Sequence, residues 1–335
     1  MAVKSDRAAP PPSGDSEAWS APGRAGPDRL TATAPDPSTP PTAAAGPFVV
    51  ILGIAQDAGY PQAGCRGACC APAWADSARR RHAACAAVVD PASGARWLLD
   101  ATPDFRAQLR MLDAIAPHPD VPGLDGILLT HAHVGHYAGL LHLGREAIDA
   151  RRVPVYGMPR LAAFLGANQP WADLVAHAHV IRVPLAEDRP VTLATGVTAV
   201  PVRVPHRDEH SETVGFRLTG PRRTVLYLPD IDGWDAWDAW GVRLEAVLAG
   251  VDVAYLDGTF WDAGELGGRR ISDVPHPLIT ATLERLASAA PAIRSRVRFI
   301  HLNHTNPLLA GDPAALRRVA ALGCAVAREG ERIAL

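Results

Sequence analysis

Runs of large apolar residues recur along the chain from residue 47 onward, and most of them end at glycine, proline or a polar residue. The first run, Pro47-Phe48-Val49-Val50-Ile51-Leu52-Gly53, is rich in β-branched residues and therefore predicts a buried strand. Similar runs predict strands at residues 86–90, 96–100, 126–130, 153–156, 191–204, 213–218, 224–228, 251–256 and 297–302.

Amphipathic spacing between these runs predicts helices at residues 104–115, 136–150, 159–165, 242–249, 278–288 and 313–322. The early strands are joined by short turns such as residues 90–94, which is typical of antiparallel pairs, whereas the later strands alternate with helices. This order predicts two mixed sheets packed as a sandwich with helices outside. Residues 47–335 contain no second linker, so we expect them to form one domain.

The first 46 residues have a different composition, dominated by Pro, Ala, Ser, Thr and Gly. A segment with so few large apolar residues cannot bury enough surface to offset the entropy of ordering it. We therefore expect residues 1–46 to be a disordered tail.

The charge balance favours a small-molecule substrate over nucleic acid or a membrane. The chain carries 33 basic and 35 acidic residues, a formal net charge of -2, which gives no long-range attraction to a polyanion. No stretch reaches the roughly 18 apolar residues that a membrane helix requires, and the N-terminus lacks the apolar core of a secretory signal. These features predict a cytoplasmic protein.

Three histidines follow directly on an apolar run, in Leu128-Leu129-Thr130-His131-Ala132-His133-Val134-Gly135-His136. The loop between the end of a strand and the start of a helix is a common position for functional residues. His131 and His133 can reach one ion where the backbone turns, and His136 can reach the same ion or a neighbour. Neutral imidazole is a favoured ligand of Zn²⁺ and Fe²⁺. The simpler alternative is a polar surface loop.

Further residues of ligand type follow later strands. His206 follows the run 200–204, Asp230 follows 225–228, and His304 ends the stretch His301-Leu302-Asn303-His304 after the run 297–300. Separate strand ends that deliver histidine and aspartate to one edge of a sheet are a known way to assemble a metal site from distant parts of a chain. Their order along the sequence therefore predicts a metal site.

A strand followed by His-x-His-x-x-His, then His, Asp and a terminal His, resembles the metallo-β-lactamase superfamily over residues 47–335. The resemblance implies an α+β fold, a four-layer αββα sandwich. It also implies one metal position made by His131, His133 and His206, a second made by His136 and His304, and Asp230 bridging both. Gly135 stands where the superfamily usually has an aspartate ligand, so the second position loses one anionic ligand. This change favours one tightly held ion, or a weakened second site, over a robust pair.

The N-terminal stretch 53–62, with the cysteines after it, resembles one branch of this superfamily, pyrroloquinoline quinone biosynthesis protein B. Residues 256–261 and 301–307 resemble the same branch. The altered histidine motif indicates a divergent paralogue, so the resemblance does not carry a substrate with it.

Two other motifs offer different metal chemistry. Residues 206–210 match the H-x-x-E-H pattern of a zinc-peptidase class, but Pro205 and the strand pattern after it disfavour the helix which that chemistry requires. Cys65, Cys69 and Cys70 could hold a structural zinc with a fourth ligand from Cys85, His82 or Asp57. Plain reduced thiols are an equal alternative, because adjacent cysteines do not easily face one ion.

These residues favour a metal-dependent hydrolase that uses Zn²⁺, as one or two ions, with Fe²⁺ or Mn²⁺ as alternatives. Metal-bound hydroxide would attack an ester, phosphoester or amide of a small molecule. Asp230 would bind the metal and orient the nucleophile, while Asp257 and Asp208 are candidates for supporting it or transferring protons. The alternatives are an oxygen-dependent enzyme with non-haem iron, related to quinone cofactor biosynthesis, and a non-catalytic metal-binding paralogue.

Overall fold

Strand β1 (Phe48–Gly53) is buried along its whole length in the computed structural model, which describes residues 46–268 and 270–335. Successive side chains of a strand point to opposite faces of its sheet. Val49 and Ile51 accordingly pack into one apolar core, and Val50 and Leu52 pack into another. A continuous apolar run thus covers both faces of the sheet, as expected for a strand buried between two layers.

Seven strands form the first sheet, in the order β14-β1-β2-β3-β4-β5-β6. Strands β14, β1, β2 and β3 pair antiparallel, whereas β3 to β6 pair parallel. The bounds of the remaining strands are β2 (Cys85–Asp90), β3 (Ala95–Leu99), β4 (Gly126–Leu128), β5 (Val153–Gly157), β6 (Val180–Pro184) and β14 (Arg332–Ala334).

The second sheet repeats this plan in the order β13-β12-β11-β10-β9-β8-β7. Its strands β7 to β10 pair antiparallel and β10 to β13 pair parallel. The bounds are β7 (Val191–Ala194), β8 (Val197–Arg203), β9 (Val214–Thr219), β10 (Thr224–Leu228), β11 (Val253–Asp257), β12 (Val297–Ile300) and β13 (Ala325–Val326). The single strand predicted at 191–204 is a hairpin, because Gly196 adopts a left-handed φ of 73° and turns the chain.

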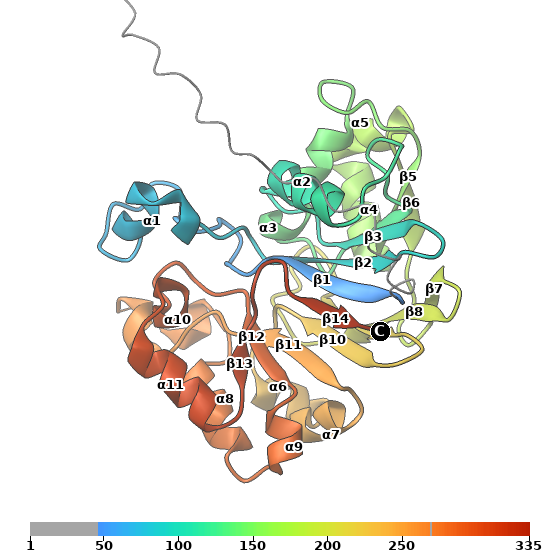
Figure 1. Cartoon of the computed structure of the whole chain (residues 1–335). Helices are drawn as coiled ribbons and strands as arrows, with labels where there is room; N and C mark the ends of the chain where they lie inside the picture. The colour runs from blue at the N-terminus through green and yellow to red at the C-terminus, as the bar shows by residue number, and fades with distance from the viewer. Residues whose placement is uncertain (1–45, 269) are drawn as a thin grey trace, which may run out of the picture. The chain divides into compact units, whose positions relative to one another are not determined.

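The two sheets pack face to face, and helices cover their outer faces (Figure 1). Leu99 of the first sheet shares a buried core with Phe216 and Tyr255 of the second. The first sheet is covered by α2 (Phe105–Ile115), α4 (Pro159–Ala167) and α5 (Trp171–Ala176). The second sheet is covered by α6 (Trp234–Ala239), α7 (Leu244–Ala249), α8 (Ile279–Leu286), α9 (Pro291–Arg294), α10 (Pro307–Ala310) and α11 (Pro313–Ala321). The predicted four-layer αββα sandwich is confirmed.

The long helix predicted at 136–150 is wrong. The chain instead forms the short helix α3 (Val134–Tyr137) and the 3₁₀ helix η2 (Ala138–Leu143). The carbonyl of His136 accepts a hydrogen bond from the Ala101 N–H, and the Gly139 N–H donates to the Ala101 carbonyl. These bonds to a distant loop compete with the i to i+4 pattern of a longer helix.

Two other predictions concern the N-terminal tail and the absence of a membrane-spanning helix. The tail predicted for residues 1–46 lies outside the described residues except for Gly46, so it stays a prediction. Within the described part of the chain, every helix is too short or too polar to cross a lipid bilayer.

Candidate metal centre

Carboxyl ends of strands from both sheets bring histidines and aspartates together at one rim of the sandwich. His131 and His133 follow β4, and His206 follows β8. Asp230 follows β10 and lies within reach of the histidine rings. The predicted convergence of distant segments is therefore present in the fold.

The first cluster consists of three imidazoles that meet at one point. His133 Nδ1 lies 2.9 Å from His131 Nε2 and 3.2 Å from His206 Nε2. The Asp230 carboxylate stands beside them, with Oδ2 3.9 Å from His131 Nε2 and Oδ1 3.7 Å from His206 Nε2. His131, His206 and Asp230 are almost completely buried.

The second cluster consists of Asp57, His136 and His301, and Asp230 contacts it as well. Asp230 Oδ2 is 2.9 Å from His136 Nε2 and 3.4 Å from His301 Nε2. A second carboxylate faces the same two nitrogens, because Asp57 Oδ1 is 3.2 Å from His136 Nε2 and 3.1 Å from His301 Nε2. Asp230 thus stands between the two clusters, as the superfamily resemblance implied.

Outer partners fix which nitrogen of each ring faces the centre. His136 Nδ1 donates to Asp100 Oδ2 at 2.8 Å, and His206 Nδ1 donates to Asp232 Oδ1 at 3.0 Å. The Thr259 hydroxyl donates to Asp257, so its oxygen accepts from His301 Nδ1 at 3.0 Å. In each case the proton sits on Nδ1, which leaves the Nε2 lone pair facing inward.

This arrangement of lone pairs fits a divalent cation. Nε2 of His136 and Oδ2 of Asp230 are buried and without a hydrogen bond, although they lie 2.9 Å apart. Such a contact lacks hydrogen-bonding geometry, as expected when both atoms point at a shared third atom. Unpaired buried acceptors are costly, and metal coordination is one way to satisfy them. Imidazole and carboxylate are ligands that suit Zn²⁺, Fe²⁺ and Mn²⁺.

The histidines at the rim differ in the direction in which their surroundings shift the pKa. Burial lowers the pKa of His131 well below its usual value, and it lowers the pKa of His133 to about 4. Both rings are therefore neutral at pH 7, the state that binds metal. Burial would also lower the pKa of His136, but the carboxylates of Asp100 and Asp230 raise it well above its usual value. A cation that binds at His136 Nε2 would therefore replace the second proton of this ring.

A further histidine, His276, lies next to the centre. Its Nδ1 donates to Asp257 Oδ2 at 2.8 Å and is 3.8 Å from Asp230 Oδ1. Asp257 is fully buried and also accepts hydrogen bonds from Thr259 and from the Ile231 N–H. Asp257 therefore positions His276 and Thr259 rather than facing the centre itself.

The sequence prediction for His304 is wrong, because His301 lies in its place. His301 is the first residue after β12 and groups with Asp57 and His136. His304 lies one turn further along and groups with the cysteines, its Nδ1 being 3.5 Å from Cys69 Sγ.

His304 is the fourth member of the cysteine cluster. Cys65 Sγ lies 3.5 Å from Cys69 Sγ, and Cys70 Sγ lies 3.5 Å from His304 Nδ1. The adjacent Cys69 and Cys70 both reach the histidine, although the sequence analysis counted their adjacency against a shared ion. Three sulfurs and one imidazole form the closed donor set of a structural zinc. The fourth ligand considered from sequence, Cys85, His82 or Asp57, lies outside this group.

Asp208 does not occupy the supporting role predicted for it. Its side chain is 64% exposed and pairs with Arg160 at 3.4 Å, because the chain turns outward after His206. The acid nearest to the outer nitrogen of His133 is Glu209, with Oε2 3.8 Å from Nε2.

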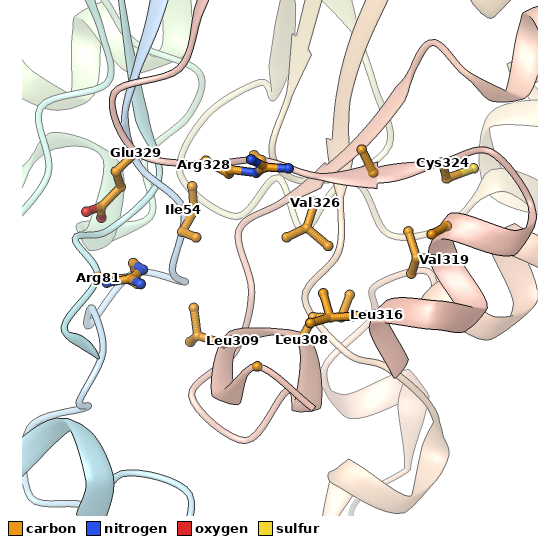
Figure 2. A pocket seen from close by; sticks show the side chains of 14 residues that line it. Ile54, Arg81, Leu308, Leu309, Leu316, Val319, Cys324, Val326, Arg328 and Glu329 are labelled. Carbon is orange, nitrogen blue, oxygen red and sulfur yellow. The ribbon is translucent and has the colours of Figure 1, made fainter. Parts of the chain in front are cut away.

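Two cavities differ in their relation to the centre. A small one of about 200 Å³ is lined by His206, Arg207, Asp232 and Trp240. A larger one of about 720 Å³ lies against β13 and α11 and is mainly apolar, with Leu308, Val319 and Val326 among its lining residues (Figure 2). Among the described residues, none of the grouped metal ligands lines the larger cavity. The smaller cavity therefore lies beside the candidate metal centre, because His206 lines it.

Sequence reasoning missed several functional residues, and the signals available for them differ. His301 had a usable signal, because it follows the apolar run 297–300 directly, although the strand was predicted to continue to residue 302. Asp100 also had a signal, because it ends a predicted strand and directly follows β3. Asp57 and His276 lie in loops whose path depends on tertiary contacts. No periodicity in the sequence reports such a path.

Comparisons with known proteins agree with this fold. Residues 95–304 match the family model described as a beta-lactamase superfamily domain. Coenzyme PQQ synthesis protein B of Xanthomonas axonopodis pv. citri (strain 306) is 31% identical, over 86% of this chain and 99% of that protein. The zinc-bound PqqB of Methylobacterium extorquens is 27% identical, with a TM-score of 0.72 over 86% of this chain and 100% of that one.

A diphosphatase of the PhnP family is similar in fold, with 21% identity and a TM-score of 0.59 over 86% of this chain and 96% of its own. The family model covers more than half of the sequence, and the curated relatives match over nearly their whole length. This chain therefore belongs to the beta-lactamase superfamily and, within it, to the family of coenzyme PQQ synthesis protein B.

Proposed function

We propose that this protein is a metal-dependent hydrolase that cleaves an ester, phosphoester or amide bond of a small molecule. The observation that carries the proposal is the pair of adjacent donor clusters that share Asp230. A divalent ion held by these residues would lower the pKa of a coordinated water toward neutrality and would so supply hydroxide at neutral pH.

The residues of the chain support each requirement of such a reaction. Burial keeps His131 and His133 in the neutral state that binds metal. His206 Nδ1 contacts Asp232, so its Nε2 faces His133. Asp230 lies between the clusters, where its carboxylate can orient a nucleophile. His276 is buried beside it and held by Asp257, and this position suits a group that holds or passes a proton.

The first experiment measures metal content and turnover together. The protein is loaded with Zn²⁺, Mn²⁺ or Fe²⁺ and assayed against activated esters, phosphodiesters and amides. We expect His133→Ala to lose both metal from the first cluster and turnover by at least about 100-fold. His177→Ala is the matched control, because His177 is exposed at the end of α5. Full metal content in His133→Ala would remove the site assignment.

A second candidate function is favoured by one observation. Asp57, His136 and His301 form a set of two histidines and one carboxylate, which is also the ligand set of non-haem iron oxygenases. The relatives named for coenzyme PQQ synthesis are compatible with either chemistry. Anaerobic purification followed by metal analysis and an oxygen electrode separates the two, since bound iron with oxygen consumption and no hydrolysis would replace the hydrolase proposal.

A further inference from the structure

Gly135 makes room for the carboxylate of Asp57. A Cβ placed on Gly135 would lie 2.4 Å from Cβ, Cγ and Oδ1 of Asp57, so no other residue fits there without displacing that side chain. Glycine within a helix is less favourable than alanine, because it loses more conformational freedom on folding. A glycine in α3, one residue before His136, thus has a steric reason to be present.

The Asp57 carboxylate faces two ring nitrogens that already face Asp230. His136 Nε2 and His301 Nε2 each lie within 3.5 Å of one oxygen from Asp57 and one from Asp230. The Nδ1 proton of each ring is used by Asp100 or Thr259. Two lone pairs and two carboxylates around one point form a site for a cation, and a divalent ion would balance both negative charges.

The segment that carries Asp57 is fixed by backbone hydrogen bonds on both sides. Gln56 N–H donates to the Leu302 carbonyl at 2.8 Å, and Leu302 N–H donates to the Ile54 carbonyl at 2.9 Å. On the other side, Ala84 N–H donates to the Ala55 carbonyl at 2.7 Å. Leu302 is the residue after His301, so Asp57 and His301 are held in register. A ligand set held in this way loses little entropy when an ion binds.

The carboxylate of Asp57 is also open to solvent on one side. Its side chain is 33% exposed, so an ion can reach it from solvent.

We propose that Asp57 is the anionic ligand of the second metal position and that Gly135 is small in order to admit its carboxylate. The missing anion inferred from Gly135 is then supplied from another part of the chain, and the centre holds two ions. This inference rests on the proposed function only in requiring a metal centre, and its test measures ion binding instead of turnover.

The test titrates Co²⁺ into apoprotein variants and counts ions by absorption and by elemental analysis after dialysis. Cobalt bound to thiolates has intense near-ultraviolet absorption, so ions at the cysteine cluster are counted separately from ions at the histidines. We expect wild type to bind two ions at the histidines and Asp57→Ala to bind one. The affinity of the second ion should fall by at least roughly 10–100-fold. Asp173→Ala, an exposed acid in α5, is the control and should match wild type.

A second set of variants at residues 57 and 135 separates the loss of a ligand from misfolding of the protein. Asp57→Asn keeps the shape of the side chain and should also lose the second ion. Gly135→Asp alone should lose it as well, because the new side chain collides with Asp57. The double variant Asp57→Gly/Gly135→Asp provides space and a carboxylate from the other side, so the second ion should return.

The outcomes separate the two proposals. Two ions in wild type and two equally tight ions in Asp57→Ala would overturn the role of Asp57 and leave the metal centre standing. A single ion at the histidines in both proteins would overturn the role of Asp57 too. Failure of wild type to bind any ion at the histidines would overturn the metal centre and, with it, this inference.

Discussion

Two non-glycine residues at the metal centre adopt left-handed backbone conformations. Asp100 has a φ of 65° and His301 has a φ of 63°. Residues with a Cβ rarely adopt this region, and such strain is retained where the surrounding structure enforces it. Asp100 orients His136, and His301 faces both carboxylates. The strain therefore lies where the direction of a side chain matters for ion binding.

The Thr259 hydroxyl allows a test at the scale of one atom. Thr259→Val keeps the shape of the side chain and removes the oxygen that accepts from His301 Nδ1. We expect the affinity for Co²⁺ at the histidines to fall by roughly 10–100-fold, because the tautomer of His301 is no longer fixed. Thr219→Val, in a hairpin pair with Thr224, is the control. Equal affinity in all three proteins would argue against tautomer control by Thr259.

Single residues also mark where sequence reasoning succeeds. His131, His133 and His206 were predicted to meet, and they do, because a strand end fixes the direction of the chain just before each histidine motif. His304 was misplaced because the sequence pattern does not say how tightly the chain turns after β12. The site role of Asp57 could not be predicted, since it depends on contacts with residues far away in sequence.

At the scale of elements, continuous apolar runs were more informative than amphipathic periods. Strands such as β1 and β10 are buried on both faces, so their runs stand out from the polar segments around them. The helix predicted at 136–150 failed because Ala101 offers its backbone groups to His136 and Gly139. Periodicity reports which face of a helix is buried, but it does not reveal a competing partner elsewhere in the chain.

One side chain joins three helices on the second sheet. Arg285 of α8 makes paired hydrogen bonds to Asp238 of α6 and to Glu245 of α7, at 2.7–3.0 Å. We expect Arg285→Met to lower the free energy of unfolding by about 2 kcal/mol, since it leaves the two carboxylates with only the more exposed Arg243 as a cation. Arg285→Lys should recover only part of this, because an ammonium group cannot make both paired contacts.

Urea denaturation measures these differences in the free energy of unfolding. Arg318→Met is a suitable comparison, because the pair of Arg318 with Glu284 is mostly exposed. Its expected loss is under about 0.5 kcal/mol. Similar losses at both positions would contradict the role given to Arg285.

At the scale of the whole molecule, the two sheets share one plan in which antiparallel strands lead into parallel ones. The composition and the strand order predicted a two-sheet sandwich, and the family resemblance added the number of layers. Strands β6, β13 and β14 were not predicted. Strands β13 and β14 span only 2 and 3 residues, and β6 is an edge strand whose apolar run is interrupted by Arg182. Edge and closing strands depend on a neighbour that is already folded, which local sequence does not reveal.

A contact between distant parts of the chain gives the stability a predictable pH dependence. His82 Nδ1 lies 3.3 Å from Glu329 Oε1. This carboxylate raises the pKa of His82 above its usual value. A raised pKa means that the pair stabilises the fold fully below the unfolded pKa of about 6.5 and loses this contribution as pH rises through the folded pKa.

Glu329→Gln tests this sign, because it keeps an acceptor for the His82 N–H and removes the charge. The difference in free energy of unfolding between wild type and the variant should be up to about 1 kcal/mol near pH 5.5 and should shrink toward about pH 9. Chemical denaturation at both pH values measures it. A difference that grows with pH would contradict the assigned protonation.

The short stretch from His301 to His304 contributes one imidazole to each candidate centre, and the segment from Asp57 to Cys70 also contributes to both. Removal of an ion from the cysteine cluster, or oxidation of its thiols, would therefore loosen the two segments that carry Asp57 and His301 at the other centre. We therefore expect an ion at the cysteine cluster to precede tight ion uptake at the histidines. We expect thiol alkylation of the apoprotein to weaken Mn²⁺ binding at the histidines, and unchanged binding would show that the centres mature independently.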